Sequence, residues 1–177
     1  MRNVTIISTG LGNNPKSHTL AVRLESLLQA RGTPTTLVDV RSWDLPHAGA
    51  PGCWDHPGVA AITAAVADAS HVVISTPVYC YDANSAAKNV IELCGRAFTD
   101  KVVGFVCQAG GLRGYMSIMG LANHMMLDFR SVIVPRYVYV AAPDWTPEGG
   151  LSVGIEQRLV RLCDDLQRIS VGPAPEA

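Results

Sequence analysis

Apolar residues along the chain follow two alternating patterns. Short runs rich in β-branched residues predict buried strands at residues 4–8, 35–40, 71–76, 102–107 and 137–141. Between them lie longer segments of helical periodicity, which predict helices near residues 20–28, 59–66, 86–94, 115–129 and 151–169. Such an alternation of strands and helices is typical of an α/β fold with a parallel sheet.

The number of these elements narrows the architecture. Five strands separated by helices in a chain of 177 residues fit one domain, which we expect to span residues 1–170. They also fit a flavodoxin-like three-layer fold, with a five-stranded parallel sheet in the order 2-1-3-4-5 and helices on both faces. The tail at 171–177, VGPAPEA, is predicted to be disordered.

Composition excludes several classes of partner. The chain is 48% hydrophobic and 16% charged, which is typical of a well-packed globular protein. A net charge of −1 gives no electrostatic reason to expect nucleic acid or a membrane surface as a partner. The five cysteines are scattered and form no C-x-x-C pair, which favours free thiols in a reducing cytoplasm. Cys53 and His56 form C-x-x-H with His47 nearby, but no fourth ligand is evident, so no metal site is predicted.

The segment after the first strand, STGLGNNPKSHT at 8–19, has the chemistry of an anion site. Its glycines let the backbone approach an anion, and the helix after it offers unpaired N–H groups at the positive end of its dipole. Ser17 and Thr19 stand near the expected helix start, where hydroxyls can donate to phosphate oxygens, and Lys16 adds charge. The segment therefore favours a phosphate-binding loop.

Two nucleotide-binding motifs match this segment incompletely. As a Walker A loop it has Pro15 in place of the second glycine, and strands three and four end without an acid for Mg²⁺. As a Rossmann fingerprint it is also broken by Pro15, although Asp39 closes the second strand where a ribose-binding acid would stand. The NTPase interpretation is set aside, and a Rossmann-type dinucleotide-binding protein remains an alternative.

Two further loops follow the third and fourth strands, at the edge where open α/β sheets bind ligands. In TPVYCYDAN, Pro77 favours an extended turn with exposed backbone donors and acceptors, and Tyr79 and Tyr81 offer aromatic walls for a flat heterocycle. In QAGGLRG, Gly110 and Gly111 let a ring approach the backbone. Three such loops at one edge favour a common ligand.

These loops resemble the motifs of the NADPH-dependent FMN reductase family. The family pattern T-P-x-Y followed by K-N-x-I-E is matched by TPVY at 76–79 and KNVIE at 88–92, with Ala87 in place of the usual leucine. The turn YDAN at 81–84 is similar to that of one branch of the family, and a glycine pair follows strand four. The resemblance extends from the first strand to about residue 141. The first loop departs from the family pattern, because it is longer and lacks the usual arginine.

The resemblance implies an FMN-dependent enzyme that transfers a hydride from NADPH or NADH through bound FMN to a second acceptor. That acceptor would be free flavin, a quinone, or a nitro or azo compound. No residue is predicted to be catalytic, because the flavin carries the chemistry. The implied phosphate site comprises Thr9, Lys16, Ser17 and Thr19. The implied isoalloxazine site comprises Pro77, Val78, Tyr79, Cys80 and Tyr81 on one side and Gln108, Ala109, Gly110 and Gly111 on the other.

Other interpretations remain open at this point. A flavodoxin-like electron carrier would have no nicotinamide activity of its own, but the near-neutral charge and the absence of T-x-T-G-x-T disfavour it. A scaffold that has lost its cofactor is a third interpretation, because the phosphate loop is altered. Relatives in the family are commonly dimers or tetramers that associate through the helices after strands three and four. The resemblance therefore implies a homodimer or homotetramer.

Overall fold

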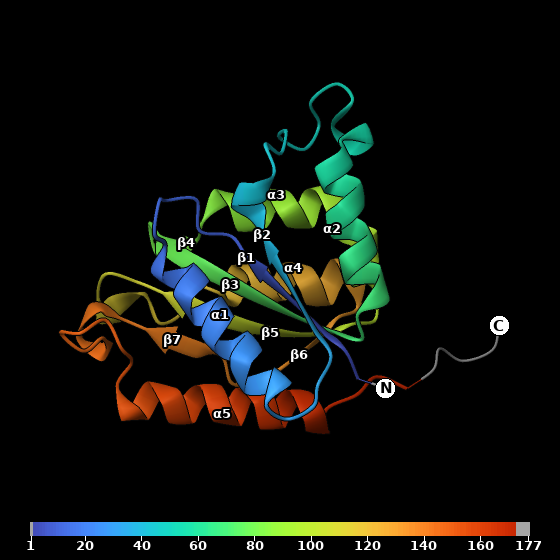
Figure 1. Cartoon of the computed structure of the whole chain (residues 1–177). Coiled ribbons are helices and arrows are strands. Elements are labelled where there is room, and N and C mark those ends of the chain that lie inside the picture. The colour runs from blue at the N-terminus through green and yellow to red at the C-terminus, as the bar shows by residue number, and fades with distance from the viewer. Residues whose placement is uncertain (1, 173–177) are drawn as a thin grey trace.

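The computed structural model describes residues 2–172 and shows a parallel sheet between two layers of helices (Figure 1). Four strands pair in parallel in the order β2-β1-β3-β5: β1 (Val4–Ser8), β2 (Thr35–Asp39), β3 (His71–Tyr79) and β5 (Val102–Gln108). Beside β5, the fifth place in the sheet is taken by β6 (Val132–Ile133) and β7 (Val138–Val140). The predicted order 2-1-3-4-5 is confirmed, because its fourth strand is β5 and its fifth is β6 with β7.

The fifth strand is interrupted where the sequence predicts one run. Val103 pairs with Ile133, whereas Val106 pairs with Val138, so β6 and β7 are out of register by two residues. Pro135 lies in the interruption and has no N–H to give to a ladder of hydrogen bonds. The last strand therefore consists of two short pieces, and the first of them begins before the predicted start at residue 137.

Helices cover both faces of the sheet. The layer on one face consists of α1 (Lys16–Gln29) and α5 (Val153–Arg168), and the other of α2 (Pro57–Asp68), α3 (Ser85–Cys94) and α4 (Met119–Phe129).

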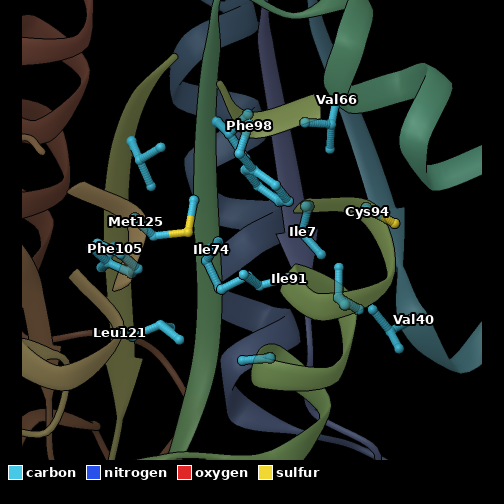
Figure 2. Close-up of a cluster of buried hydrophobic side chains, with 14 of the residues drawn as sticks. Ile7, Val40, Val66, Ile74, Ile91, Cys94, Phe98, Phe105, Leu121 and Met125 are labelled. Atoms are coloured by element: carbon cyan, nitrogen blue, oxygen red, sulfur yellow. The ribbon is translucent and has the colours of Figure 1, made fainter. Parts of the chain in front are cut away.

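Side chains alternate along each strand and fill both layers. Ile6 of β1 packs in the cluster with α1 and α5, whereas its neighbour Ile7 packs in the cluster with α2, α3 and α4. Figure 2 shows this second cluster, in which Ile74, Phe105 and Met125 lie together. Because both faces are covered, the central strands are apolar at nearly every position, which is why they are visible in the sequence.

Two segments differ from the prediction. β3 continues past residue 76 to Tyr79, because Pro77 stays in register with Gln108 of β5. The chain then turns back on itself and forms a hairpin with β4 (Asp82–Ala83). The helix predicted to start at residue 115 starts at Met119, after a short 3₁₀ turn.

The carboxyl ends of the strands lie at one edge of the sheet, on the left of Figure 1, where the loops after β1, β3, β5 and β7 gather. Residues 171–172 follow α5 without regular structure. The rest of the tail predicted to be disordered, 173–177, lies outside the described residues.

Candidate functional site

The loop between β1 and α1 carries free backbone donors. Helix α1 begins at Lys16 after Pro15, no side chain caps its N-terminus, and no acid stands in its first turn. Within residues 2–172, no acceptor is found for the N–H groups of residues 10–14, Lys16 or Ser17. Free N–H groups at the positive end of a helix dipole are the donors that an anion needs.

Ser17 places a buried hydroxyl beside these donors. The residue is 0% exposed, and its Oγ has no hydrogen-bond partner in the described part of the chain. A Cβ added at Gly10 would lie 2.4 Å from this Oγ and 2.6 Å from Pro15 Cβ, so the glycine keeps the space next to the hydroxyl open. A buried polar group without a partner costs about 1–3 kcal/mol. Its position at the helix start therefore points to a ligand that accepts its hydrogen bond.

Thr9 faces the interior of the protein. Its hydroxyl lies 3.0 Å from Asn84 Oδ1, and its carbonyl accepts a hydrogen bond of 2.7 Å from Asn84 Nδ2. Its N–H donates to the Ser75 carbonyl at 2.9 Å. Because all its polar groups are engaged, Thr9 fixes the base of the loop and has no free donor for a ligand.

Lys16 and Thr19 are both exposed on the first turn of α1. The Nζ of Lys16 lies 4.9 Å from the centre of the Trp145 ring, a cation–π contact that holds the long side chain at the side of the loop. Both residues are thus close to the free N–H groups in the chain, and Lys16 supplies the positive charge at this end of the helix.

Arg41 ties the end of β2 to the same loop. Its Nε and Nη2 donate to the two carboxylate oxygens of Asp39, at 3.0 and 2.6 Å, and its Nη1 donates to the carbonyls of Asn13 and Gly12, at 3.2 and 3.4 Å. Burial raises the pKa of Asp39, but the hydrogen bonds from Arg41 and the nearby His18 outweigh it and hold that pKa below its ordinary value. Asp39 is already paired, which argues against a ribose-binding role.

The hairpin of β3 and β4 projects from the middle of the carboxyl edge. Cys80 and Tyr81 form its two-residue turn, with φ values of 51° and 64°. Type I′ turns need positive φ at both positions, and such a conformation is uncommon for residues other than glycine, asparagine and aspartate. Tyr79 and Tyr81 are 61% and 69% exposed, so the turn places two aromatic side chains in solvent at this edge.

The loop after β5 is braced by Tyr139 of β7. The hydroxyl of Tyr139 donates to the Gly111 carbonyl at 2.5 Å and accepts from the Gly114 N–H at 3.1 Å. Gly110 and Gly111 have no positive φ, and a Cβ at either would meet no protein atom within 4 Å. The protein's own packing does not require these two glycines, which is expected if a ligand lies against them.

The hairpin and the glycine loop line one open cavity of about 640 Å³, a size typical of small-molecule sites. Six predicted ring-site residues line it: Val78, Cys80, Tyr81, Ala109, Gly110 and Gly111. Pro77 and Gln108 pair with each other inside the sheet, and Tyr79 alternates away from Val78, so these three do not line the cavity. Arg113 is the one charged residue in its lining.

Sequence reasoning missed Tyr139 and Arg41, which hold the two loops. Neither stands in a binding motif, and each contacts its loop only because β7 pairs with β5 and β2 pairs with β1. A tyrosine in the middle of a predicted strand and an arginine directly after one were the available signals, and neither is specific to a binding site.

Comparisons with known proteins agree with this geometry. The chain matches the family described as NADPH-dependent FMN reductase over residues 2–146, whereas a search of curated proteins finds no match. Among solved structures of similar fold is an oxidoreductase from Corynebacterium diphtheriae, with 20% identity, a TM-score of 0.79, and coverage of 95% of this chain and 96% of that one.

Two further solved structures have the same fold. An apo NADH:FMN oxidoreductase, EmoB, has 15% identity and a TM-score of 0.82, with 99% of this chain and 92% of that chain covered. FerB of Paracoccus denitrificans, a flavoenzyme NAD(P)H:acceptor oxidoreductase, has 17% identity and a TM-score of 0.76, with 97% and 100% covered. Structural likeness at such identities shows the fold, whereas the family match spans most of the sequence. The chain therefore belongs to the NADPH-dependent FMN reductase family.

Proposed function

We propose that the protein binds FMN and uses it to transfer a hydride from NADPH or NADH to a second, small-molecule acceptor. The observation that carries the proposal is the first loop, where free N–H groups meet a buried Ser17 hydroxyl without a partner. The terminal phosphate of FMN has several oxygens and satisfies such donors together. Bound FMN would supply the two-electron chemistry, because its N5 atom accepts and returns a hydride.

The phosphate would be held at the start of α1. The N–H groups of residues 10–14 and the Ser17 hydroxyl donate to its oxygens, while Lys16 and Thr19 add a positive charge and a second hydroxyl. Thr9, which the resemblance also assigns to this site, acts through its bonds to Asn84 by fixing where the loop starts.

The isoalloxazine would lie between Pro77–Tyr81 and Gln108–Gly111, in the open cavity. Within the described residues no acceptor is found for the N–H groups of Gly110 and Gly111, so both can donate to the polar rim of the ring. Tyr81 supplies an aromatic wall, and Tyr139 keeps the glycine loop in place. Arg113 at the cavity lies where it would attract the phosphates of a nicotinamide dinucleotide.

The acceptor would bind in the same cavity after the oxidised dinucleotide leaves, because the cavity is open to solvent. Free flavin, a quinone, or a nitro or azo compound are flat molecules that suit such a site. Their relative rates measured with one electron donor would identify the preferred class.

A titration tests the function directly. Visible absorption spectra of the purified protein are recorded with FMN and with riboflavin, followed by anaerobic addition of NADPH or NADH. We expect FMN to bind and the visible absorption of the bound flavin to bleach with at least one nicotinamide. Failure to bind FMN would contradict the proposal, and binding without bleaching by either nicotinamide would support an electron carrier.

We also propose that the protein is a cytoplasmic homodimer or homotetramer. Helix α4 exposes Met119, Met126 and Leu127, and a cavity of about 690 Å³ with Trp54 and Leu127 in its lining lies beside α3. Exposed apolar groups of this kind are typical of interfaces. Light scattering measures the mass in solution, and Leu127→Glu is expected to yield monomers, whereas a monomeric wild type would contradict the proposal. No helix within residues 2–172 is long and apolar enough to cross a membrane.

A further inference from the structure

We propose that Arg41 is a positioning residue for the phosphate loop. Paired with Asp39, it holds the carbonyls of the loop so that the N–H groups remain free for the FMN phosphate. The inference rests on the proposed function, because it takes the FMN phosphate as the ligand of this loop. It assigns a role to the end of β2, from which neither the loop motif nor the family resemblance takes any residue.

Arg41 restrains a loop that has no other hydrogen bonds among the described residues to hold it in place. Residues 11–14 are exposed, and the N–H groups of residues 10–14 have no acceptor in the described chain. Within residues 2–172, the hydrogen bonds that reach residues 10–14 are the two that Arg41 Nη1 donates to the carbonyls of Gly12 and Asn13. Without them the loop would have to be ordered at the moment of binding, and that loss of conformational entropy weakens affinity.

The side of the peptide that Arg41 contacts matters for an anion. The C=O and N–H groups of one peptide unit point in opposite directions, so a guanidinium that binds the carbonyls leaves the N–H groups on the other side. A carbonyl oxygen turned toward a phosphate would repel it, whereas aligned N–H groups form an anion-binding concavity. The contact therefore fixes the direction in which the peptide groups of the loop point, as well as the position of the loop.

Asp39 fixes Arg41 in turn. Its carboxylate takes the Nε and Nη2 donors of the guanidinium and also accepts from the Arg41 N–H at 3.1 Å, which leaves Nη1 for the loop. The same carboxylate lies 3.6 Å from His18 Nδ1, and that atom lies 3.2 Å from Ser8 Oγ. These contacts connect β1, β2 and α1 around the loop. Because Asp39 neutralises the charge of Arg41, the effect on the phosphate is geometric.

Two flavins separate this role from a general structural one. FMN and riboflavin share the ring and differ in the phosphate, so the ratio of their dissociation constants reports the phosphate site. For Arg41→Ala we expect FMN binding to weaken about tenfold, or about 1.4 kcal/mol, while riboflavin binding stays within about twofold of wild type. Arg41→Lys keeps the positive charge but not the planar guanidinium, so its FMN affinity should lie between those of the wild type and Arg41→Ala.

Arg23→Ala is the matched control. Arg23 makes the same kind of paired contact, with Nε and Nη2 donating to Glu156 at 3.0 and 2.9 Å, but does not touch the loop. We expect it to leave both dissociation constants unchanged. An unchanged FMN-to-riboflavin ratio in Arg41→Ala overturns the inference.

A measurement on the ligand-free protein distinguishes this inference from the proposed function. Backbone ¹⁵N order parameters of residues 10–14 should be those of a rigid backbone in the wild type and Arg23→Ala, and fall below about 0.6 in Arg41→Ala. If the wild type binds neither flavin, the proposed function fails, while these order parameters still show whether Arg41 holds the loop. Equal order parameters in all three proteins would contradict the restraint itself.

Discussion

The two edges of the sheet differ in whether their polar groups have hydrogen-bond partners within the protein. At the amino edge, the Ser70 N–H donates to Asn3 Oδ1 at 2.9 Å, and His71 Nε2 donates to the Ile169 carbonyl at 2.9 Å. Lys101 reaches back to carbonyls near the end of α2. Each of these groups has a protein partner, so this edge is complete without a ligand.

The carboxyl edge is different. In the described part of the chain, four buried side-chain polar atoms have no hydrogen-bond partner: Ser17 Oγ at the start of α1, Ser117 Oγ and Trp145 Nε1 in the segments after β5 and β7, and Tyr137 Oη just before β7. Satisfied polar groups stabilise a fold, and unsatisfied ones reduce its stability. The comparison teaches that the polar groups of the amino edge have protein partners, whereas at the carboxyl edge the buried Ser17 hydroxyl lacks one among the described residues, at the place where the phosphate is proposed to bind.

Filling the space at Gly10 should disrupt the proposed phosphate site, and we expect it to have the largest effect. In Gly10→Ala, the new Cβ would meet Ser17 Oγ and Pro15, so we expect FMN affinity to fall about a hundredfold, or about 2.8 kcal/mol. The dissociation constant is measured by quenching of flavin fluorescence. Gly154→Ala in α5 is the control, because a Cβ there meets nothing within 4 Å and the residue belongs to neither proposed site, so it should bind FMN as the wild type does. Equal losses in both variants would argue against the special role of Gly10.

The proposed ring site can be disrupted separately. In Gly111→Ala, the new Cβ stands at the wall of the open cavity with no protein atom within 4 Å, so we expect FMN and riboflavin to lose affinity by a similar factor of about ten. The melting temperature without ligand should stay close to that of the wild type, since no protein atom is displaced. A loss confined to FMN would show that this loop contacts the phosphate instead of the ring.

Ser17→Ala would sharpen the comparison, because stability and affinity should move in opposite directions. Removing a buried hydroxyl without a partner should raise the free energy of unfolding of the ligand-free protein by about 1 kcal/mol. The same change should weaken FMN binding about tenfold and leave riboflavin binding unchanged. Urea denaturation and the two flavin titrations measure these effects. A variant that is less stable than the wild type would contradict the assignment of this hydroxyl to a ligand.

A change at the amino edge should alter how the free energy of unfolding depends on pH, without altering FMN affinity. Burial lowers the pKa of His71 below its ordinary value of 6.5, and its bond to the Ile169 carbonyl offsets this only in part. As pH falls below about 6.5, the unfolded chain binds a proton that the folded protein does not, so the free energy of unfolding decreases. His71→Gln should remove this part of the pH dependence in urea denaturation. Its FMN affinity at neutral pH should match the wild type, and an unchanged pH profile would contradict the prediction.

Much of the fold follows from local patterns, because strands buried on both faces are continuous apolar runs. The exceptions depend on partners that are distant in sequence. The sequence predicts a turn at Pro77, yet Pro77 extends β3 because Gln108 lies opposite it in β5. The hairpin after it has no local signal either, since Cys80 and Tyr81 replace the asparagine and glycine that usually mark a type I′ turn.

The site divides in the same way. The free N–H groups around Ser17 follow from glycines and a helix start, which a short motif displays. The bonds of Tyr139 to Gly111 and of Arg41 to Asn13 each join residues 28 positions apart, so no local motif contains them. Thr9 shows the converse, because Asn84, 75 residues later, engages a hydroxyl that its motif would assign to the phosphate.

The break in the last strand also bears on how copies of the protein behave in a crowded solution. β6 and β7 form an open edge of the sheet, and a complete edge strand offers a row of free backbone groups on which another chain can add a strand. Here β6 has 2 residues and β7 has 3, and the segment 134–137 between them contains Pro135 and Arg136. A proline and a charge at such a break hinder continued pairing. The interruption thus protects the sheet against edge-to-edge aggregation.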